Sequence, residues 1–309
     1  MLFYILMEII PLGKHSGLNL DFELHKSISN EVLGVIQISH GMAEHTGRYS
    51  YFIEFLNKNG FHVLIHNHRG HGARLLEQRL GFFGSSNGWE KVVEDIKIIN
   101  SKSINLFPDL PQILLGHSMG SWLAMSCLQQ GGNFDILLLS GSSKPHPIET
   151  FFQKMLLNFE ILRLGKKGYS HFLHKIIFGG LNSKFKNTKT DNDWLSRDTK
   201  SVKEYTEDPL CGFVVSNQLW VDVINGIKEV FKPSQLQLLK KEIPILVFSG
   251  SDDPVGGMGQ GTSRLHKTIK NIGCNSHLYL IEGDRHETLN ETNKMKTYNY
   301  LVNFLKENI

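Results

Sequence analysis

The chain has 309 residues, of which 40% are hydrophobic, and its formal net charge is +3. This length exceeds one average domain and fits one large α/β domain that carries an insertion. The nearly neutral charge excludes a nucleic-acid binder that relies on a basic surface. Three cysteines, Cys127, Cys211 and Cys274, are widely separated and odd in number. They predict no disulfide or zinc framework and favour a reducing compartment, so we expect a cytoplasmic protein.

The first ten residues are apolar apart from Glu8 and could be mistaken for a secretion signal. They lack a basic start, and no small-residue cleavage site precedes Pro11. The stretch is too short to span a membrane, and no apolar run of sufficient length occurs elsewhere. We expect a first strand here, or a start codon placed slightly upstream, and no transmembrane segment.

Short apolar stretches alternate with helix-length segments through the first half of the chain. After a hairpin around Ser16 and Gly17, this alternation predicts a mostly parallel, doubly wound sheet with helices on both faces. We expect strands at residues 33–39, 61–66, 113–115 and 135–140, and helices at 48–59, 88–104 and 119–130. The pattern resumes with strands at residues 244–248 and 278–281 and a closing helix at 292–308.

The alternation stops between residues 144 and 233, where the chain is instead helical and aromatic. An insertion between sheet strands predicts a cap over the carboxyl edge of the sheet, where ligands bind in such folds. We therefore expect one domain over residues 1–309 with an inserted helical cap at 144–233. The inserted block has 14 Lys and Arg against 10 Asp and Glu. This excess suits an anionic or interfacial substrate, or it is simply a solvated surface.

Residues 116–120 read Gly-His-Ser-Met-Gly and lie between an expected strand and an expected helix. A serine in the middle of a G-x-S-x-G turn is typical of a nucleophile elbow. A serine hydroxyl is a poor nucleophile, so it needs a turn where a base reaches it from one side and substrate from the other. The flanking glycines let the two backbone arms pass closely. Ser118 is therefore the candidate nucleophile.

Two loops that directly follow later strands supply the base and the acid that a serine nucleophile needs. The loop at residues 249–256 contains Asp252 and Asp253, which spacing alone cannot separate, and the loop at 282–287 contains His286. The order Ser, Asp, His is that of the α/β-hydrolase fold. Each side chain follows the end of a parallel strand, so we expect all of them at one edge of the sheet.

The oxyanion of a tetrahedral intermediate needs backbone N–H donors. In this fold they come from the residue after the nucleophile and from a loop after an early strand. These positions predict Met119 and Met42 as the two donors of the oxyanion hole.

A rival interpretation is a metal site at residues 66–71, which read His-Asn-His-Arg-Gly-His. The spacing matches the H-x-H-x-D-H run of di-zinc hydrolases, in which His and Asp bind metal. Gly70 stands in the Asp position, and no further Cys or His cluster stands out downstream. We therefore favour a structural loop beside the active site and expect no metal.

Four motifs together resemble the monoacylglycerol lipase and lysophospholipase group, which belongs to the serine aminopeptidase-like branch of the α/β hydrolases. They are H-G-x-x-E-H-x-G-R-Y at residues 40–49, H-R-G-H-G at 68–72, the elbow at 116–120, and G-x-x-H at 283–286. Further stretches resemble the bacterial members, so the resemblance covers nearly the whole chain: residues 193–198, 208–213 and 286–291.

The resemblance implies an α/β-hydrolase fold and a serine carboxylic-ester hydrolase that acts on acylglycerol or lysophospholipid-type esters through an acyl-enzyme, without a cofactor. The acid of the family is the Asp directly before Pro-Val, which is Asp253 here. Glu44 and Arg48 are implied to hold the polar end of a glycerol-like substrate; the alternative is an internal ion pair that shapes the oxyanion loop. Leu289 stands where the mammalian glycerol-ester enzymes have a second His, so the same recognition of glycerol is not implied.

Phe151, Phe152 and Met155 share one face of an expected cap helix. We expect this face to line a tunnel for an acyl chain, and the cap to touch a membrane surface transiently. The alternatives are a serine aminopeptidase-like peptidase, a small-ester carboxylesterase and, from a different class, a non-catalytic acyl-binding protein. A peptidase of this kind would need a buried acidic patch for the substrate ammonium.

Overall fold

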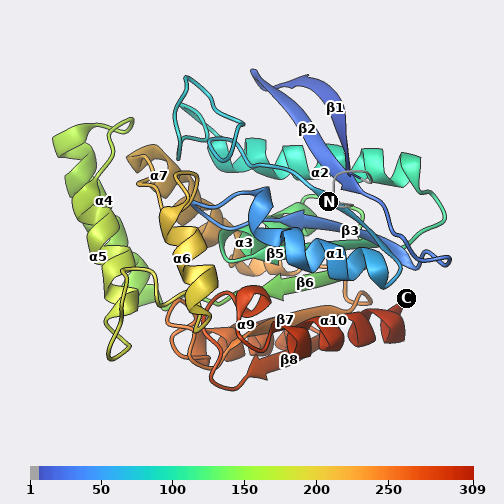
Figure 1. Ribbon diagram of the computed structural model, residues 1–309. Helices are drawn as coiled ribbons and strands as arrows, with labels where there is room; N and C mark the ends of the chain where they lie inside the picture. Colours follow the sequence, from blue (N-terminus) through green and yellow to red (C-terminus); the bar gives the residue numbers. More distant parts are fainter. Residues whose placement is uncertain (1–6) are drawn as a thin grey trace.

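The computed structural model describes residues 7–309, and its centre is a single sheet of eight strands (Figure 1). The strands are β1 (Met7–His15), β2 (Leu18–His25), β3 (Gly34–Ser39), β4 (Phe61–Ile65), β5 (Gln112–His117), β6 (Ile136–Ser140), β7 (Ile245–Gly250) and β8 (Ser276–Ile281). Their order is β1-β2-β4-β3-β5-β6-β7-β8. β1 and β2 pair antiparallel, as do β2 and β4, and all later neighbours are parallel. The predicted mostly parallel sheet is confirmed.

The predicted first strand begins at Met7, and residues 1–6 of that prediction lie outside the described residues. The hairpin turns at Ser16 and Gly17, as predicted, with φ angles of 45° and 87°. A two-residue turn with both φ angles positive matches the twist of the flanking strands, which explains why glycine occupies the second position.

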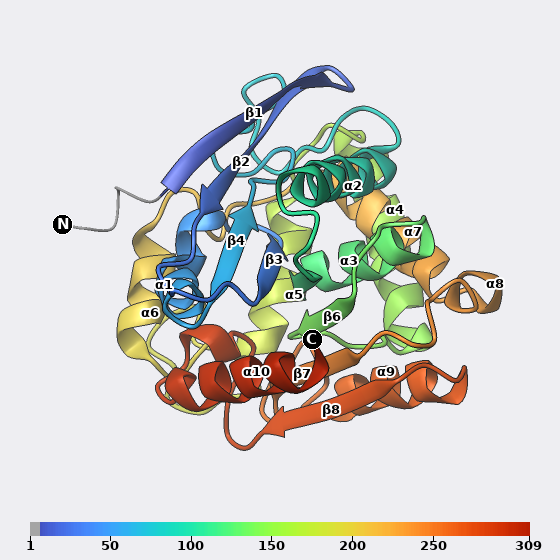
Figure 2. The same cartoon turned by 90° about the vertical axis from the view of Figure 1, so that its right-hand side faces the viewer.

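Helices cover both faces of the sheet (Figure 2). Ile113 and Leu115 of β5 face one helical layer, whereas Leu114 between them faces the other. Because water reaches neither face, β5 is buried at every position, which explains why the central strands are apolar runs. One layer consists of α1 (Ser50–Lys58) and α10 (Lys294–Asn308), and the other of α2 (Gly88–Leu106), α3 (Met119–Gln129) and α9 (Gln260–Asn271).

Between β6 and β7 the chain leaves the sheet and forms a group of helices beside the carboxyl ends of the strands (Figure 1). Ser170, Asp198 and Ser216 each accept a hydrogen bond from an N–H of the helix that follows, which explains where three of them begin. Among the helices of residues 7–309, none combines the length and the apolar character of a membrane span. The group comprises α4 (Pro147–Leu164), α5 (His171–Asn182), α6 (Thr199–Glu207), α7 (Asn217–Val230) and α8 (Pro233–Leu236).

Gly120 lets α3 approach β3 closely, since a Cβ at this position would lie 2.0 Å from the carbonyl oxygen of Ser39. We predict that Gly120→Ala lowers the free energy of unfolding by about 1–3 kcal/mol through overpacking, measured by urea denaturation. Gly180→Ala in α5 is the matched control, because nothing lies within 4 Å of its Cβ position. The control should be neutral or stabilising. Equal midpoints for Gly120→Ala and the wild type would contradict this account.

Candidate active site

Ser118 lies in the tight turn between β5 and α3 with φ 51° and ψ −118°, a backbone conformation that non-glycine residues rarely adopt. The turn needs small neighbours, because a Cβ on Gly116 would lie 2.4 Å from the carbonyl oxygen of Gly120. β5 is an interior strand, between β3 and β6, so the turn opens at the middle of the sheet edge. A strained strand-to-helix turn of this kind is typical of a nucleophile elbow, and the role of Ser118 as nucleophile stays a prediction.

Asp253 and His286 meet at the same edge, from the loops after β7 and β8. The Asp253 Oδ1 atom lies 3.0 Å from His286 Nδ1, and both side chains are buried. The Ser249 hydroxyl and the Val255 N–H donate to Asp253 at 2.6 and 2.9 Å, and they fix the carboxylate. Asp252 instead accepts a bond from its neighbour Ser251 at 3.1 Å. The structure therefore pairs His286 with Asp253, the acid that the resemblance implied.

Mutual attraction shifts both pKa values in the direction that favours the charged pair. Burial alone would raise the pKa of Asp253, but the charge of His286 and the hydrogen bonds to the carboxylate hold it below the ordinary value. Burial alone would lower the pKa of His286, but Asp253 and then Glu287 outweigh it and raise the pKa. An imidazole of this kind can accept a proton from a hydroxyl and stabilise the resulting charge.

His117, directly before Ser118, is a second histidine at this site, which sequence reasoning did not single out. Its ring centre lies 4.8 Å from that of His286, and its Nδ1 lies 3.2 Å from the Ser140 hydroxyl oxygen. Burial and the neighbouring His286 lower the pKa of His117 to about 3, so the ring is neutral. No carboxylate of residues 7–309 pairs with His117, which leaves His286 as the better base.

The loop after β3 has the form of an oxyanion hole. Gly41 N–H donates to Glu44, and Ala43 N–H donates to His71 Nε2 at 3.1 Å. The Ala43 carbonyl accepts from the Tyr205 hydroxyl at 3.1 Å and from the Gly212 N–H at 2.8 Å.

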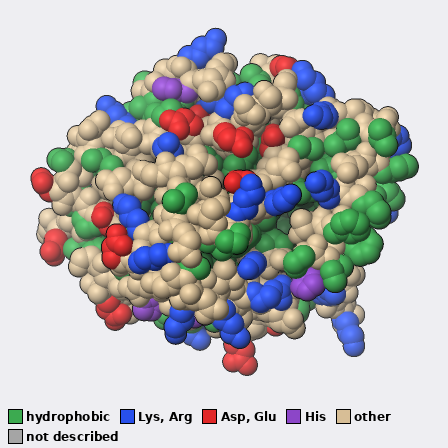
Figure 3. Space-filling model, turned by 180° about the vertical axis from the view of Figure 1, so that it is seen from behind, with side chains coloured by type: hydrophobic (Ala, Val, Ile, Leu, Met, Phe, Trp, Pro, Cys, Tyr) green, Lys and Arg blue, Asp and Glu red, His purple; other side chains and the backbone are tan. Residues whose placement is uncertain are grey.

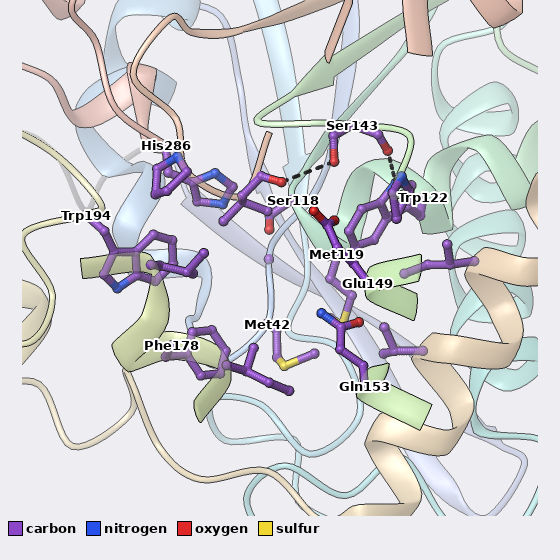
Figure 4. A pocket seen from close by; sticks show the side chains of 18 of the residues that line it. Met42, Ser118, Met119, Trp122, Ser143, Glu149, Gln153, Phe178, Trp194 and His286 are labelled. Atoms are coloured by element: carbon purple, nitrogen blue, oxygen red, sulfur yellow. Dashed lines mark hydrogen bonds between the residues drawn. The ribbon is translucent and has the colours of Figure 1, made fainter. Parts of the chain in front are cut away.

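Between these fixed groups, the Met42 N–H has no acceptor within residues 7–309, and neither has the Met119 N–H. Both residues line the same pocket as Ser118 (Figure 4). Two unpaired donors beside a serine can bind a developing oxyanion, and this role stays a prediction for Met42 and Met119.

Glu44 and Arg48 do not form the predicted pair that holds a substrate. Arg48 is buried and donates to Glu287 at 2.6 Å and to Ser201 of α6 at 3.1 Å, and it does not line the pocket. The Glu44 carboxylate lines the pocket but accepts from Gly41 and, at 2.9 Å, from the Tyr49 hydroxyl. The alternative of an internal ion pair describes Arg48 better, with Glu287 as the partner instead of Glu44.

The two carboxylates respond differently to burial. Burial and the nearby charge of Glu287 raise the pKa of Glu44 to about 7. Burial would also raise the pKa of Glu287, but Arg48 outweighs it and holds the pKa below the ordinary value. Glu287 follows His286 directly in the chain, so Arg48 neutralises the carboxylate that lies nearest to the base in sequence.

The predicted tunnel residues Phe151, Phe152 and Met155 lie on the outer face of α4, where 65%, 56% and 56% of each residue is exposed. The opposite face of this helix contributes Glu149 and Gln153 to the pocket (Figure 4). This prediction was wrong because an apolar stripe shows that residues share a face but not what that face meets.

Apolar residues of α5 and α7 form the pocket wall instead. The pocket has a volume of about 380 Å³ and contains both Ser118 and His286 (Figure 4). The α7 residues recur at intervals of three and four, a helical period that the sequence could have revealed. The wall comprises Ile176, Ile177, Phe178, Leu181, Trp220, Val223, Ile224 and Ile227.

His68 and His71, which belong to the rival metal motif, make structural hydrogen bonds in this protein. His71 holds Ala43, and His40 Nε2 accepts the N–H of His68 at 2.9 Å. His68 Nε2 lies 3.1 Å from the Ser39 hydroxyl oxygen. Burial lowers the pKa values of these rings, so they are neutral hydrogen-bonding groups under the oxyanion loop.

Comparison with known proteins relates this geometry to one family. The family described as serine aminopeptidase, S33, matches residues 30–293. The monoacylglycerol lipase of Mycolicibacterium smegmatis is 28% identical over 265 residues, which are 84% of this chain and 82% of that protein. The phospholipase YtpA of Bacillus subtilis is 24% identical over 84% of this chain and 90% of its own.

A solved structure has the same fold. The thermostable carboxyl esterase of Bacillus coagulans, in complex with glycerol, superposes with a TM-score of 0.88 at 24% identity. The match covers 98% of this chain and 99% of that one. The predicted α/β-hydrolase fold is therefore confirmed.

We predict that Arg48→Met raises the pKa of His286, because it removes a positive charge and leaves Glu287 unbalanced. The acidic limb of the pH profile of kcat/KM reports this pKa. With a soluble p-nitrophenyl ester, we expect the limb to move upward by about one pH unit, so that activity falls at a higher pH.

Two control variants separate charge from packing. Arg48→Lys keeps the charge and should shift the limb less, and Arg79→Met removes a surface arginine paired with Glu77 and should not shift it. An unchanged acidic limb in Arg48→Met would show that Arg48 does not tune the base.

Proposed function

The chain belongs to the serine aminopeptidase, S33 family, and we propose that this serine hydrolase cleaves acylglycerol or lysophospholipid-type esters through an acyl-enzyme on Ser118. One observation carries the proposal: a serine in a strained strand-to-helix turn shares an apolar pocket with a histidine paired to a buried aspartate. The names of the relatives, monoacylglycerol lipase and phospholipase, support ester substrates of lipids.

In the proposed reaction, the Ser118 hydroxyl attacks the ester carbonyl while His286 accepts its proton. Asp253 keeps the imidazole oriented and stabilises the imidazolium. The N–H groups of Met42 and Met119 bind the oxyanion of the tetrahedral intermediate. His286 then returns the proton to the departing alcohol, which leaves the acyl group on Ser118. Water next attacks the acyl carbonyl while His286 accepts its proton, and His286 donates this proton to Ser118 Oγ as the fatty acid leaves.

The shape and lining of the pocket support an acyl chain as the acyl part of the substrate. A volume of about 380 Å³ lies in the range of small-molecule sites, and aliphatic and aromatic side chains of α5 and α7 dominate its wall. Each buried methylene of a substrate contributes about 0.8 kcal/mol. Long-chain esters should therefore be better substrates than short ones, which disfavours a small-ester carboxylesterase.

A serine aminopeptidase is the second candidate, because Glu44 and Glu287 line the pocket and could accept a substrate ammonium. Arg48 already neutralises Glu287, and the pKa of Glu44 is raised to about 7. This cluster therefore has little net negative charge to offer an ammonium, and we favour the ester hydrolase. A panel of monoacylglycerols, lysophospholipids and aminoacyl amides separates the two.

We predict that Ser118→Ala lowers kcat for ester hydrolysis by about 10⁴-fold or more and abolishes labelling by a fluorophosphonate probe. Ser86→Ala, in an exposed loop, is the control and should keep both activities. Full ester hydrolysis by Ser118→Ala would disprove the proposed nucleophile. If the wild-type protein cleaved aminoacyl amides but no esters, the peptidase would be favoured. If the fluorophosphonate probe labelled the wild-type protein but the protein turned over no ester or amide, a non-catalytic acyl-binding protein would be favoured.

We also propose that α4 and α5 contact a membrane surface. Their outer faces expose large apolar side chains, and Figure 3 shows hydrophobic side chains gathered on the side of the molecule where these helices lie. Leu162 is 88% exposed and Phe151 is 65% exposed. The other members of this patch are Ile148, Phe152, Met155, Phe159, Phe172 and Ile176.

Charge and continuity with the pocket support a lipid partner. Residues 147–189 contain eight Lys or Arg but only two Asp or Glu, which favours an anionic surface. Ile176 belongs to the exposed patch and also lines the pocket, so the patch reaches the route to Ser118. A lipid ester could pass from the bilayer to the nucleophile along apolar surface.

We predict that Phe151→Ser/Leu162→Ser weakens binding to phosphatidylglycerol vesicles by about 10-fold or more, measured by co-sedimentation, because two apolar side chains no longer enter the interface. Ile28→Ser, which changes an exposed apolar residue outside the cap helices, should bind as the wild type does. Thermal unfolding should confirm that both variants are folded. Unchanged vesicle binding by the double variant would reject this surface.

A further inference from the structure

The pocket has a second wall that the acyl chain does not explain. Lys144 follows β6, Arg264 lies in α9, and both line the pocket together with Thr150 and Gln153 of α4. This wall is polar and basic, in contrast to the apolar residues of α5 and α7. A substrate that fills the pocket therefore meets two chemically different surfaces.

Lys144 and Arg264 are neighbours. An Arg264 Nη donates to the Lys144 carbonyl at 3.3 Å, and the Lys144 ammonium donates to the Thr268 hydroxyl at 3.2 Å. The Lys144 ammonium also lies 5.8 Å from the ring centre of Phe231. The Lys144 N–H donates to Gly261 at 3.0 Å, which fixes this backbone against the start of α9.

Neither cation has a carboxylate within 4.0 Å among the described residues. In contrast, the buried arginines Arg48, Arg69 and Arg74 each pair with one. Glu149 also lines the pocket, from the first turn of α4, but it pairs with neither cation. Both side chains are half-buried, and a bound anion would supply the counter-charge that the described residues do not.

The basic wall and the nucleophile line the same pocket and are linked through Trp122. Trp122 follows Ser118 by one turn of α3, a rise of about 5 Å, and lines the pocket. Its indole N–H donates at 2.8 Å to the carbonyl of Ser143, the residue directly before Lys144. A lipid whose ester lies at Ser118 would therefore share the pocket with Lys144 and Arg264.

We propose that Lys144 and Arg264 bind the phosphate of a lysophospholipid headgroup while the acyl chain lies against α5 and α7. Guanidinium and ammonium groups are the usual partners of phosphate, and the planar guanidinium can donate two parallel hydrogen bonds to it. A neutral monoacylglycerol gains nothing from this pair. The inference rests on the proposed ester hydrolase and selects the lysophospholipid from its two substrate classes.

The test compares decanoyl lysophosphatidylglycerol with monodecanoylglycerol, each below its critical micelle concentration so that membrane binding plays no part. We expect the wild type to favour the phospholipid. Lys144→Gln/Arg264→Gln should lower the ratio of the two kcat/KM values by about 10- to 100-fold, the range for a charge-assisted hydrogen-bonded pair. Lys267→Gln, an exposed change in the same helix, is the matched control and should leave the ratio unchanged.

An unchanged ratio in the double variant would overturn the phosphate site, although the ester hydrolase would stand. If the wild type hydrolysed no ester and was not labelled by the fluorophosphonate probe, the proposed function itself would be rejected. Calorimetric titration of Ser118→Ala with both lipids tests binding without turnover, and equal affinities would again overturn the site. If inorganic phosphate still bound while a lysophospholipid occupied the pocket, Lys144 and Arg264 would hold a separate anion. This result would reject their proposed role in binding the headgroup.

Discussion

The parallel sheet is the constraint on which the site depends. β3, β5, β7 and β8 all end at one edge, and each is followed by one part of the site: the oxyanion loop, Ser118, Asp253 and His286. Ser118 contributes only because its backbone is held at φ 51°, a costly conformation that close packing around Gly116 and Gly120 maintains. Close packing in the apolar interior of the molecule therefore stabilises the strained backbone of Ser118 at the carboxyl end of the strands.

The cap helices are part of this site and not merely a cover. Tyr205 of α6 donates to the Ala43 carbonyl of the oxyanion loop, and Ser201 of the same helix accepts from Arg48. Arg48 in turn holds Glu287, the neighbour of His286. Displacement of α6 would therefore disturb the oxyanion loop and the base together, whereas α4 and α5 contribute walls to the pocket and an exposed apolar surface.

The proposed membrane contact and the proposed headgroup site use two different surfaces. Outside, α4 and α5 expose apolar and basic residues; inside, apolar residues of α5 and α7 line the pocket together with Lys144 and Arg264. Both arrangements fit an amphiphile that leaves a membrane and meets a nucleophile between its chain and its headgroup. In both proposed steps, hydrophobic burial would provide affinity and charge would select the lipid.

From the sequence alone the sheet and its helices could be predicted, because period and strand order are local patterns. Ser118 and His286 could be expected at one edge of the sheet, because parallel strands end at a common edge. Contacts between residues far apart in the chain, by contrast, depend on the tertiary packing, because no local pattern encodes them. Arg48 finds Glu287 from 239 positions away, and Asp253 rather than its neighbour Asp252 faces His286. The face of α4 that holds Phe151 meets solvent, since a stripe along a helix carries no information about what packs against it.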